Sequence, residues 1–377
     1  MRLADLTTLG VGGDADPVVA PATSEELIDT VRDVWASGDE WLILGGGSNV
    51  VISDDGFDGT VIRVVTRGIE RFTPTTAAVR PSAYLGDRGV RLRVAAGEPW
   101  DALVAHTVEN GWAGIEALSG IPGSSGAAPI QNIGAYGQEV GSSLVAIEFL
   151  DYLTGELEWI PVPRLGLGYR TSILKQGREG VVTRIELELS EERDGATALS
   201  QPIGYAQLAT ALGVRIGDRV PIAELRSTVL ALRASKGMLI DPNDRDSFSA
   251  GSFFTNPIVS ENFARGLPAG APRWPTAPEE QDVAVPLGEA PVVPRVSGEY
   301  RVKLSAAWLI EKAGIGRGFA LPGSHAAVSS KHTLALVNRG GATADEILQL
   351  ARYIQTRVYS EFGAQLQPEP VIVGTTI

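Results

Sequence analysis

Two glycine-rich segments contain the residues best suited to hold a ligand through the backbone. The first, residues 45–49 (GGGSN), follows the apolar run 41–44. Glycine has no Cβ, so successive backbone N–H groups can converge on an anion, and Ser48 and Asn49 can add side-chain donors. The segment is a candidate diphosphate cradle; the alternative is an ordinary turn between two strands.

The second segment, residues 120–137, consists mainly of small and amide side chains. Such residues make a poor hydrophobic core, but they let a chain wrap a large flat cofactor closely and bond it through the backbone. A long stretch without periodicity inside a compact domain is usually functional or disordered. We therefore interpret residues 119–141 as a cofactor-binding loop.

Two better-known phosphate loops do not fit the sequence. A Walker A loop requires a Gly-Lys dipeptide, and the chain contains none. Residues 10–15 (GVGGDA) match the dinucleotide fingerprint G-x-G-x-x-A, but no strand precedes them and no helix follows. We interpret that match as accidental.

The elements that must position the first segment are clear from capping and periodicity. Thr23 and Glu26 predict a capping box, apolar residues follow at helical spacing, and Gly38 predicts the end of the helix. Strands are expected at 41–44, 50–52 and 60–65. The first 65 residues therefore predict a small β-α-β-β unit.

The rest of the chain alternates between strand and helix patterns. The helix at 343–362 is the clearest, with a capping box, one apolar stripe and a terminal Gly363. Residues 261–298, rich in Pro, Ala and Glu, predict a surface excursion without chemistry. Further strands are expected at 91–94, 144–152, 158–162, 181–189 and 371–373, and further helices at 100–110, 221–234 and 303–313.

Composition excludes several classes of function. With 32 basic and 45 acidic residues, the net charge of −13 argues against nucleic-acid binding. There is no Cys, so disulfides and thiolate metal sites are excluded, and three His make a His-rich metal centre or a hydrolase triad improbable. No apolar run approaches a membrane span and no signal segment opens the chain. We expect a cytoplasmic protein with no metal site and no membrane insertion.

Six strings in the sequence resemble one group of flavoproteins. The segments 45–49 and 120–137, in this order, are similar to the FAD-binding domain of the vanillyl-alcohol oxidase and para-cresol methylhydroxylase superfamily. The second string is closer still to one of its families, the UDP-N-acetylenolpyruvoylglucosamine reductases. Supporting strings occur at 7–13 (TTLGVGG), 168–172 (GYRTS), 250–257 (AGSFFTNP) and 307–311 (AWLIE).

The resemblance implies an α+β fold with a FAD-binding domain of this type in two α/β lobes, plus a C-terminal α/β substrate-binding domain. The expected boundaries are 1–67 for the first lobe, which residues 364–377 join as a C-terminal strand, and 68–218 for the second lobe, with a substrate loop around Tyr205. Residues 219–363 would form the substrate-binding domain. A monomer is favoured.

The implied reaction belongs to cytoplasmic peptidoglycan precursor synthesis. NADPH reduces noncovalently bound FAD, and the flavin then delivers hydride to C3 of UDP-N-acetylglucosamine enolpyruvate, giving UDP-N-acetylmuramate. The implied cofactor-binding residues are Gly45, Gly46, Gly47, Ser48, Asn49, Val50, Ser119, Gly120, Ile121, Pro122, Gly123, Ser124, Gly126, Ala127, Gln131, Asn132, Gly134, Ala135, Tyr136 and Gly137.

Three residues match the family's catalytic positions. Arg170 would face the substrate carboxylate, and its always-charged guanidinium can bind a developing enediolate bidentately. Ser252 would donate the proton to C2. Glu369 would either donate to the carboxylate as a neutral acid or orient Arg170 as an anion, and the sequence leaves both open.

Four residues match substrate-binding positions. Tyr205, Lys236 and Asn256 would hold the UDP diphosphate, and His332 would be a polar wall residue. His106 and His325 are expected to be solvated. Many relatives have E-P-E-V-R near the end, where this chain has Gln367 through Val371 (QPEPV), so a second charged contact from that strand is in doubt.

Two alternatives stay open at this point. The chain could be another flavin oxidoreductase of the same superfamily; a covalent flavin link is not expected, because there is no Cys and no His lies in the cofactor strings. It could also be a non-catalytic flavin or nucleotide-sugar binding protein. The presence of Arg170, Ser252 and Glu369 argues against that second alternative.

Overall fold

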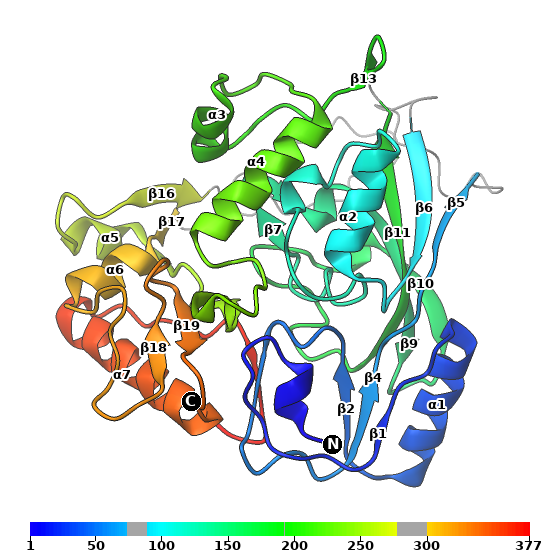
Figure 1. Ribbon diagram of the computed structural model, residues 1–377, viewed down its shortest axis with the longest axis horizontal. Coiled ribbons are helices and arrows are strands. Elements are labelled where there is room, and N and C mark those ends of the chain that lie inside the picture. Colours follow the sequence, from blue (N-terminus) through cyan, green and yellow to red (C-terminus); the bar gives the residue numbers. More distant parts are fainter. Residues whose placement is uncertain (74–88, 192, 277–299) are drawn as a thin grey trace, which may run out of the picture.

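A small parallel sheet carries the first glycine segment. The computed structural model describes residues 1–73, 89–191, 193–276 and 300–377. The predicted helix is α1 (Ser24–Ser37), whose capping box at Thr23 and left-handed Gly38 are both present. It packs beside three parallel strands in the order β1-β4-β2, and β2 ends directly before Gly45 (Figure 1). The strands are β1 (Val18–Val19), β4 (Thr60–Arg63) and β2 (Trp41–Leu44).

A second parallel pair joins distant parts of the sequence. Strand β3 (Val50–Ile52) pairs with β20 (Val371–Val373), with Val50 opposite Val371. The Val371 N–H donates to the Asn49 carbonyl at 3.0 Å, so the end of the glycine segment lies beside Glu369 and Val371. The predicted strands at 50–52 and 371–373 are confirmed.

An antiparallel five-stranded sheet forms the other wall of this half of the molecule. Its order is β10-β9-β11-β6-β5, and α2 (Trp100–Glu109) packs near it (Figure 1). Buried aliphatic residues from β6, β9 and β11 form one core together with Trp100 and Phe149. The strands are β10 (Leu157–Pro161), β9 (Leu144–Asp151), β11 (Gly180–Ser190), β6 (Gly89–Ala95) and β5 (Ile69–Phe72).

The predicted cofactor loop has little regular structure but is tightly packed. Ser119 and Ser125 are fully buried, and Asn132 is nearly so. Asn132 donates to Glu139 and to the Gly168 carbonyl while its Oδ1 accepts from Gly141, so one amide pins the loop in three places. Side-chain hydrogen bonds of this kind take the place of the backbone hydrogen bonds of a helix or sheet, and they hold an irregular segment in one conformation.

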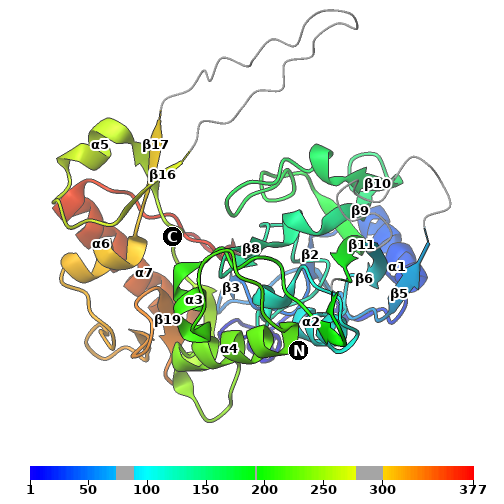
Figure 2. The same ribbon diagram turned by 90° about the horizontal axis from the view of Figure 1, so that it is seen from above.

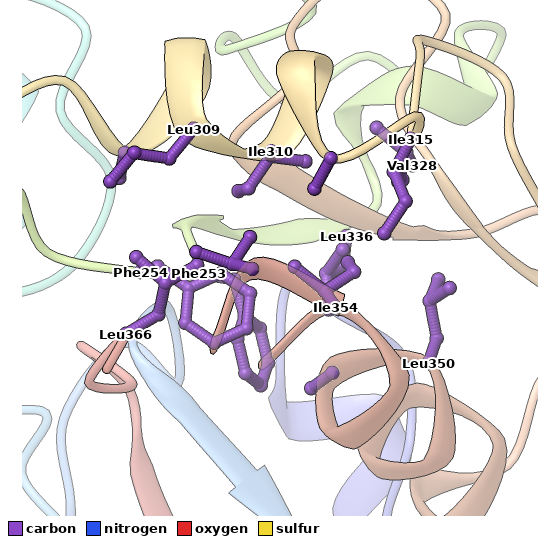
Figure 3. Close-up of a cluster of buried hydrophobic side chains, with 14 of the residues drawn as sticks. Phe253, Phe254, Leu309, Ile310, Ile315, Val328, Leu336, Leu350, Ile354 and Leu366 are labelled. Atoms are coloured by element: carbon purple, nitrogen blue, oxygen red, sulfur yellow. The ribbon is translucent and has the colours of Figure 1, made fainter. Parts of the chain in front are cut away.

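A separate hydrophobic core forms around the longest helix. Helix α7 (Ala344–Phe362) begins at the predicted Thr343 capping box and buries Ile347, Leu350 and Ile354. Figure 3 shows Leu350 and Ile354 on the same core as Phe253, Phe254 and the apolar face of α6 (Ala306–Lys312), and Ile347 belongs to this core as well. This part of the molecule lies apart from the α1 side, with α3 and α4 between them (Figure 2). Its strands are β14 (Ser249–Ser252), β19 (Ala335–Asn338), β18 (Ala326–Val328), β15 (Ile258–Ser260), β17 (Arg301–Leu304) and β16 (Arg273–Thr276).

Two expectations for this part were wrong. The helix expected at 303–313 begins only after Ser305, whose side chain caps it, while Lys303 belongs to strand β17. Residues 261–276 are not a solvated excursion, because they form α5 (Glu261–Gly266) and β16 and bury Ala264 and Ala271 in the core. The remainder of that predicted excursion, 277–298, lies outside the described residues.

The connecting region contains helices α3 (Ala206–Leu212) and α4 (Ile222–Ser235). Helix α3 was not expected from the sequence. Among the described residues, no helix is long and apolar enough to cross a membrane. The short elements are β7 (Gly134–Ala135), β8 (Gln138–Glu139), β12 (Arg193–Asp194), β13 (Thr197–Ala198) and 3₁₀ turns at Leu3–Leu6, Glu116–Leu118, Val140–Ser142, Val162–Arg164 and Arg245–Ser247.

Candidate active site

A long cavity of about 840 Å³ runs past both glycine-rich segments. Its lining includes residues 45–50, much of 121–134, and the side chains of Arg170, Ser252 and Glu369. A cavity near the upper end of the usual ligand-site range, about 300–1,000 Å³, suits a dinucleotide-sized molecule. The two segments that the sequence singled out thus lie in one site.

The two glycine segments touch each other through their backbones. A Cβ on Gly46 would lie 2.6 Å from the Gly123 Cα, and a Cβ on Gly45 would lie 2.5 Å from the Ser124 Oγ. Ser48 donates to the Pro122 carbonyl at 3.2 Å, and Asn49 donates to Gln131 Oε1 at 2.7 Å. The side chains of Ser48 and Asn49 therefore hold the two segments together, and both residues also line the cavity.

The backbone of the first segment keeps its donors free. Within the described chain, the N–H groups of residues 45–49 donate to no protein acceptor, although these residues line the cavity. Converging free N–H groups are an anion cradle, and they fit the diphosphate of a dinucleotide. The cavity and these donors therefore fit FAD.

The cavity lining contains most of the expected cofactor residues. Those present are Gly45, Gly46, Gly47, Ser48, Asn49, Val50, Ile121, Pro122, Gly123, Ser124, Gly126, Ala127, Gln131 and Gly134. Ser119, Gly120, Asn132, Ala135, Tyr136 and Gly137 are not in the lining. Asn132 instead pins the loop, and Tyr136 contacts residues of the expected substrate site, as described below.

One end of the cavity holds a cation and an acid from distant segments. Arg170 lies in a left-handed backbone conformation, with φ of 56°. Its guanidinium donates to the Gly134 carbonyl at 2.6 Å and the Asn132 carbonyl at 3.3 Å, and its Nε lies 3.5 Å from Glu369 Oε1. The loop carbonyls therefore fix the guanidinium plane beside the Glu369 carboxyl group.

Glu369 is held by its backbone as well as by Arg170. Its N–H donates to the Phe253 carbonyl at 2.8 Å, and its own carbonyl accepts from Lys175 Nζ at 3.1 Å. Burial raises the pKa of Glu369 above its ordinary value, against the opposing charges of Arg170 and Lys175. Burial also lowers the pKa of Lys175. The environment thus shifts Glu369 toward its neutral form.

Ser252 ends strand β14 at the same cavity. Gly251 before it has a φ of 75°, and the pairing of β14 with β19 is irregular between Ser249 and Ser252. The Ser252 hydroxyl makes no hydrogen bond within the described chain, while Phe253 N–H donates to the Leu334 carbonyl. The hydroxyl is thus a free donor in the cavity wall.

A second group of side chains lies on α3, α4 and the cofactor loop. Lys236 Nζ donates to Gln207 at 3.1 Å and lies 5.4 Å from the centre of the Tyr136 ring. The Tyr136 and Tyr205 rings meet edge to face at 5.9 Å. The structure therefore brings Lys236 and Tyr205 together through Tyr136, and Tyr205 remains 44% exposed.

Arg233, one turn before Lys236 on α4, connects this group to the cavity. It is buried, it lines the cavity, and its Nε has no partner in the described chain. Burial together with the charges of Lys236, Arg233 and Arg317 lowers the pKa of His332 to about 4. His332 is therefore neutral at physiological pH, in a strongly cationic environment that favours an anionic ligand.

The structure agrees with only some of the expectations for Asn256, His325 and His106. Asn256 Oδ1 accepts the Ala306 N–H at 3.0 Å, and within the described chain Asn256 makes no hydrogen bond with Lys236 or Tyr205. His325 is exposed as expected. His106 was expected to be solvated but is half-buried, with its ring edge to face against Trp112.

Sequence reasoning missed Lys175 and Arg233. Both had a usable signal: Lys175 follows Arg170 in the same short segment, and Arg233 precedes Lys236 by three residues, which places both on one helix face. No group of three or more possible metal ligands occurs among the residues that the structure describes.

Comparison with known proteins agrees with this geometry. The FAD binding domain family matches residues 15–160, and the UDP-N-acetylenolpyruvoylglucosamine reductase C-terminal domain family matches residues 241–373. The UDP-N-acetylenolpyruvoylglucosamine reductase of Leifsonia xyli is 59% identical over 100% of this chain and 98% of its own length. That of Saccharopolyspora erythraea is 47% identical over 100% and 95%.

A solved structure shows the same fold. The crystal structure of UDP-N-acetylenolpyruvylglucosamine reductase from Thermus caldophilus aligns with a TM-score of 0.60 at 26% identity, over 99% of this chain and 97% of that one. The expected α+β fold with a FAD-binding domain is confirmed, as is FAD as the cofactor. The chain belongs to the UDP-N-acetylenolpyruvoylglucosamine reductase family.

Proposed function

We propose that this enzyme reduces UDP-N-acetylglucosamine enolpyruvate to UDP-N-acetylmuramate with NADPH, as a cytoplasmic monomer, and that Arg170, Glu369 and Ser252 carry out the reductive step. The observation that supports these roles is the convergence of all three residues on one end of the FAD cavity. When bound, FAD would supply the redox chemistry, the transfer of a hydride from NADPH to C3 of the enolpyruvyl group.

Arg170 binds the substrate carboxylate and the enediolate charge that develops when hydride arrives. Two loop carbonyls already fix its guanidinium, so little reorganisation is needed during the reaction. A fixed cation in a partly buried site stabilises developing charge much more than one in water. Its side chain is 20% exposed, which is consistent with such a site.

Glu369 acts as a neutral acid that donates a hydrogen bond to the same carboxylate. The raised pKa that burial gives this carboxyl group supports the protonated form over the anion. Arg170 and Glu369 would then hold the carboxylate from two directions. Lys175 holds the Glu369 backbone in place by its hydrogen bond to the Glu369 carbonyl.

Ser252 donates the proton that C2 requires after C3 has accepted hydride. A hydroxyl is a weak acid, so it can serve only a strongly basic carbon centre such as the enediolate. The Ser252 hydroxyl has no hydrogen-bond partner among the described residues, which leaves it available to the substrate. Hydride at C3 and a proton at C2 together complete the two-electron reduction of the double bond.

The UDP diphosphate binds between Lys236 and Tyr205, with Arg233 and the neutral His332 at the wall. The Nε of Arg233, which has no partner in the part of the chain that the structure describes, and the lowered pKa of His332 both support an anionic ligand there. We propose that Asn256 contributes through its amide N–H₂, because its Oδ1 is already used by Ala306.

Separate measurement of the two half-reactions tests the proposal. In Ser252→Ala, flavin reduction by NADPH should match the wild type, while single-turnover reoxidation by the enolpyruvyl substrate should slow by about 10²–10⁴-fold. Ser252→Thr, which keeps a hydroxyl, is the matched control and should retain more of the rate. Wild-type reoxidation in Ser252→Ala would assign the proton to water or another residue. Wild-type protein whose reduced flavin the substrate does not reoxidise would contradict the reductase reaction itself.

A further inference from the structure

The N-terminal segment crosses between the two parts of the molecule that form the cavity. Leu3 is fully buried in the core of the small parallel sheet, together with Val50. Leu9 is fully buried in the other core, the one around α7, together with Phe253. The chain therefore passes from one core to the other between residues 3 and 9.

Thr8, within this crossing, forms hydrogen bonds with both sides. Its backbone N–H donates to the Gly47 carbonyl of the cradle at 3.0 Å. Its Oγ1 donates to the Ser249 carbonyl at 2.7 Å, across 241 positions of sequence. Gly47 is packed closely against the same segment, because a Cβ on it would overlap the Leu6 carbonyl. Thr8 therefore connects the glycine cradle to the first residue of strand β14.

The connection continues from Ser249 to the proposed proton donor. Ser249 is buried, and its Oγ accepts the Gly251 N–H at 3.2 Å. Gly251 has a left-handed backbone conformation, with φ of 75°, immediately before Ser252. Both Gly251 and Ser252 line the cavity. A shift of Ser249 would therefore change the position of the Ser252 hydroxyl.

Asn338 of strand β19 holds the residues that follow Thr8. Its buried side chain donates to the Leu9 carbonyl at 3.2 Å and to the Gly10 carbonyl at 3.1 Å. Its own N–H donates to the Phe248 carbonyl, directly before β14. The crossing segment is thus fixed to β19 as well as to the cradle, so the Thr8 hydroxyl acts on β14 from a rigid support.

We propose that Thr8 is a positioning residue for the reductive step, and that its hydroxyl fixes Ser252 relative to the cradle on which the flavin diphosphate would bind. This inference rests on the proposed function, which assigns the proton at C2 to Ser252. Hydride and proton must reach neighbouring carbons of one substrate, so the flavin and the Ser252 hydroxyl need a defined separation. A displacement of about 1 Å can cost about 100-fold in rate.

Thr8→Val tests the role of the hydroxyl, because valine has nearly the same shape and keeps the backbone N–H. Flavin content and flavin reduction by NADPH should stay within about twofold of the wild type, while single-turnover reoxidation by the enolpyruvyl substrate should slow by about 10- to 100-fold. Thr8→Ser keeps a hydroxyl and should restore most of the rate. Thr356→Val removes an exposed hydroxyl that donates within α7 and is the matched control.

A double substitution separates positioning of Ser252 from a general loss of stability. If Thr8 acts through Ser252, Thr8→Val should cause no further slowing in the Ser252→Ala background. Hydrogen–deuterium exchange of residues 249–254 should also increase in Thr8→Val but not in Thr8→Ser, which is a measurement independent of activity. If Thr8→Val does not fold, Ser249→Ala, which removes the hydrogen bond to the Gly251 N–H, provides the same test.

Four outcomes would overturn the proposal. They are loss of flavin from Thr8→Val, equal slowing of the two half-reactions, undiminished slowing by Thr8→Val in the Ser252→Ala background, and a wild-type reoxidation rate in Thr8→Val. The last outcome would leave the proposed function intact. A wild-type reoxidation rate in Ser252→Ala would instead overturn the proposed role of Ser252 and this inference together.

Discussion

The two functional regions of the cavity are built in different ways. The cradle at 45–49 uses backbone N–H groups from one short segment, braced by Gly123 and Gln131. The reductive end, where we propose that the substrate is reduced, contains the side chains of residues 170, 175, 252 and 369, which three separate parts of the chain provide. The first region depends on the absence of side chains, and the second depends on their charges.

This difference predicts different consequences of substitution. In the cradle, an added side chain should reduce flavin binding, because two backbone segments meet where its Cβ would lie. At the reductive end, loss of a charge or of a proton donor should slow the reaction while the flavin stays bound. Arg170→Met and Gly46→Val separate the two effects, and substitutions of Lys236 and His332 test substrate binding and stability, with smaller expected effects.

Removing the guanidinium should affect only the reductive end. Arg170→Met should slow substrate-dependent reoxidation by about 10²–10³-fold, the loss typical of one preorganised electrostatic contact. Arg170→Lys keeps the charge but loses the planar fork, so its rate should lie between those of Arg170→Met and the wild type. Stopped-flow absorbance measures the rate, with flavin content as the control. A fast Arg170→Met enzyme would remove Arg170 from the mechanism.

Adding a side chain should break only the cradle. Gly46→Val would place its Cβ against the Gly123 backbone, so the two segments must separate and flavin content should fall at least tenfold. The ratio of visible to protein absorbance reports occupancy. Gly270→Val, where nothing lies within 4 Å of the added Cβ, is the control. Full occupancy in Gly46→Val would show that the contact between the two segments does not hold the cradle.

A substitution of Lys236 should affect substrate binding without affecting either the cradle or the reductive end. Lys236→Ala should weaken binding of the UDP substrate by about tenfold or more, the usual cost of one charged hydrogen bond, and leave flavin reduction at saturating NADPH unchanged. Lys312→Ala, on the last turn of α6, is the control for loss of a lysine. If flavin reduction by NADPH were blocked in Lys236→Ala, Lys236 would instead belong to the step in which NADPH reduces the flavin.

The smallest effect concerns stability. The pKa of His332 is about 4 in the folded chain, below the ordinary value of 6.5, so the unfolded chain binds more protons between these pH values. The free energy of unfolding should therefore rise as pH increases from 4 to 6.5. Urea denaturation at pH 5 and 7 should show a smaller rise in His332→Asn than in the wild type. An equal rise in the free energy of unfolding in both proteins would mean that a group other than His332 causes the pH dependence.

The cradle could be predicted from the sequence because its chemistry is local. Glycines adjacent in the sequence are adjacent in space, and the capping residues of α1 and α7 likewise act within one turn. The use of Ser48 and Asn49 could not be predicted in this way. Their partners lie 74 and 82 residues away, and only the folded chain brings them together.

The reductive end was accessible only through resemblance. Nothing in the sequence around Glu369 indicates that it lies beside Arg170. The short distance in sequence from Arg170 to Lys175 draws attention to Lys175 but does not show that it binds the Glu369 carbonyl. The helix expected at 303–313 was wrong for a similar reason. Pairing with β15 and β16 places residues 301–304 in a sheet, although their spacing also suits a helix.

The pairing of β3 with β20 has a consequence for the order of events in biosynthesis. Asn49 and Glu369 are 320 residues apart, and a ribosome adds about 5–20 residues per second. The glycine segment therefore waits on the order of tens of seconds after its synthesis before Glu369 and Val371 exist to close the cavity. The wall of the cavity that Glu369 and Val371 form is therefore completed only after nearly the whole chain has been made.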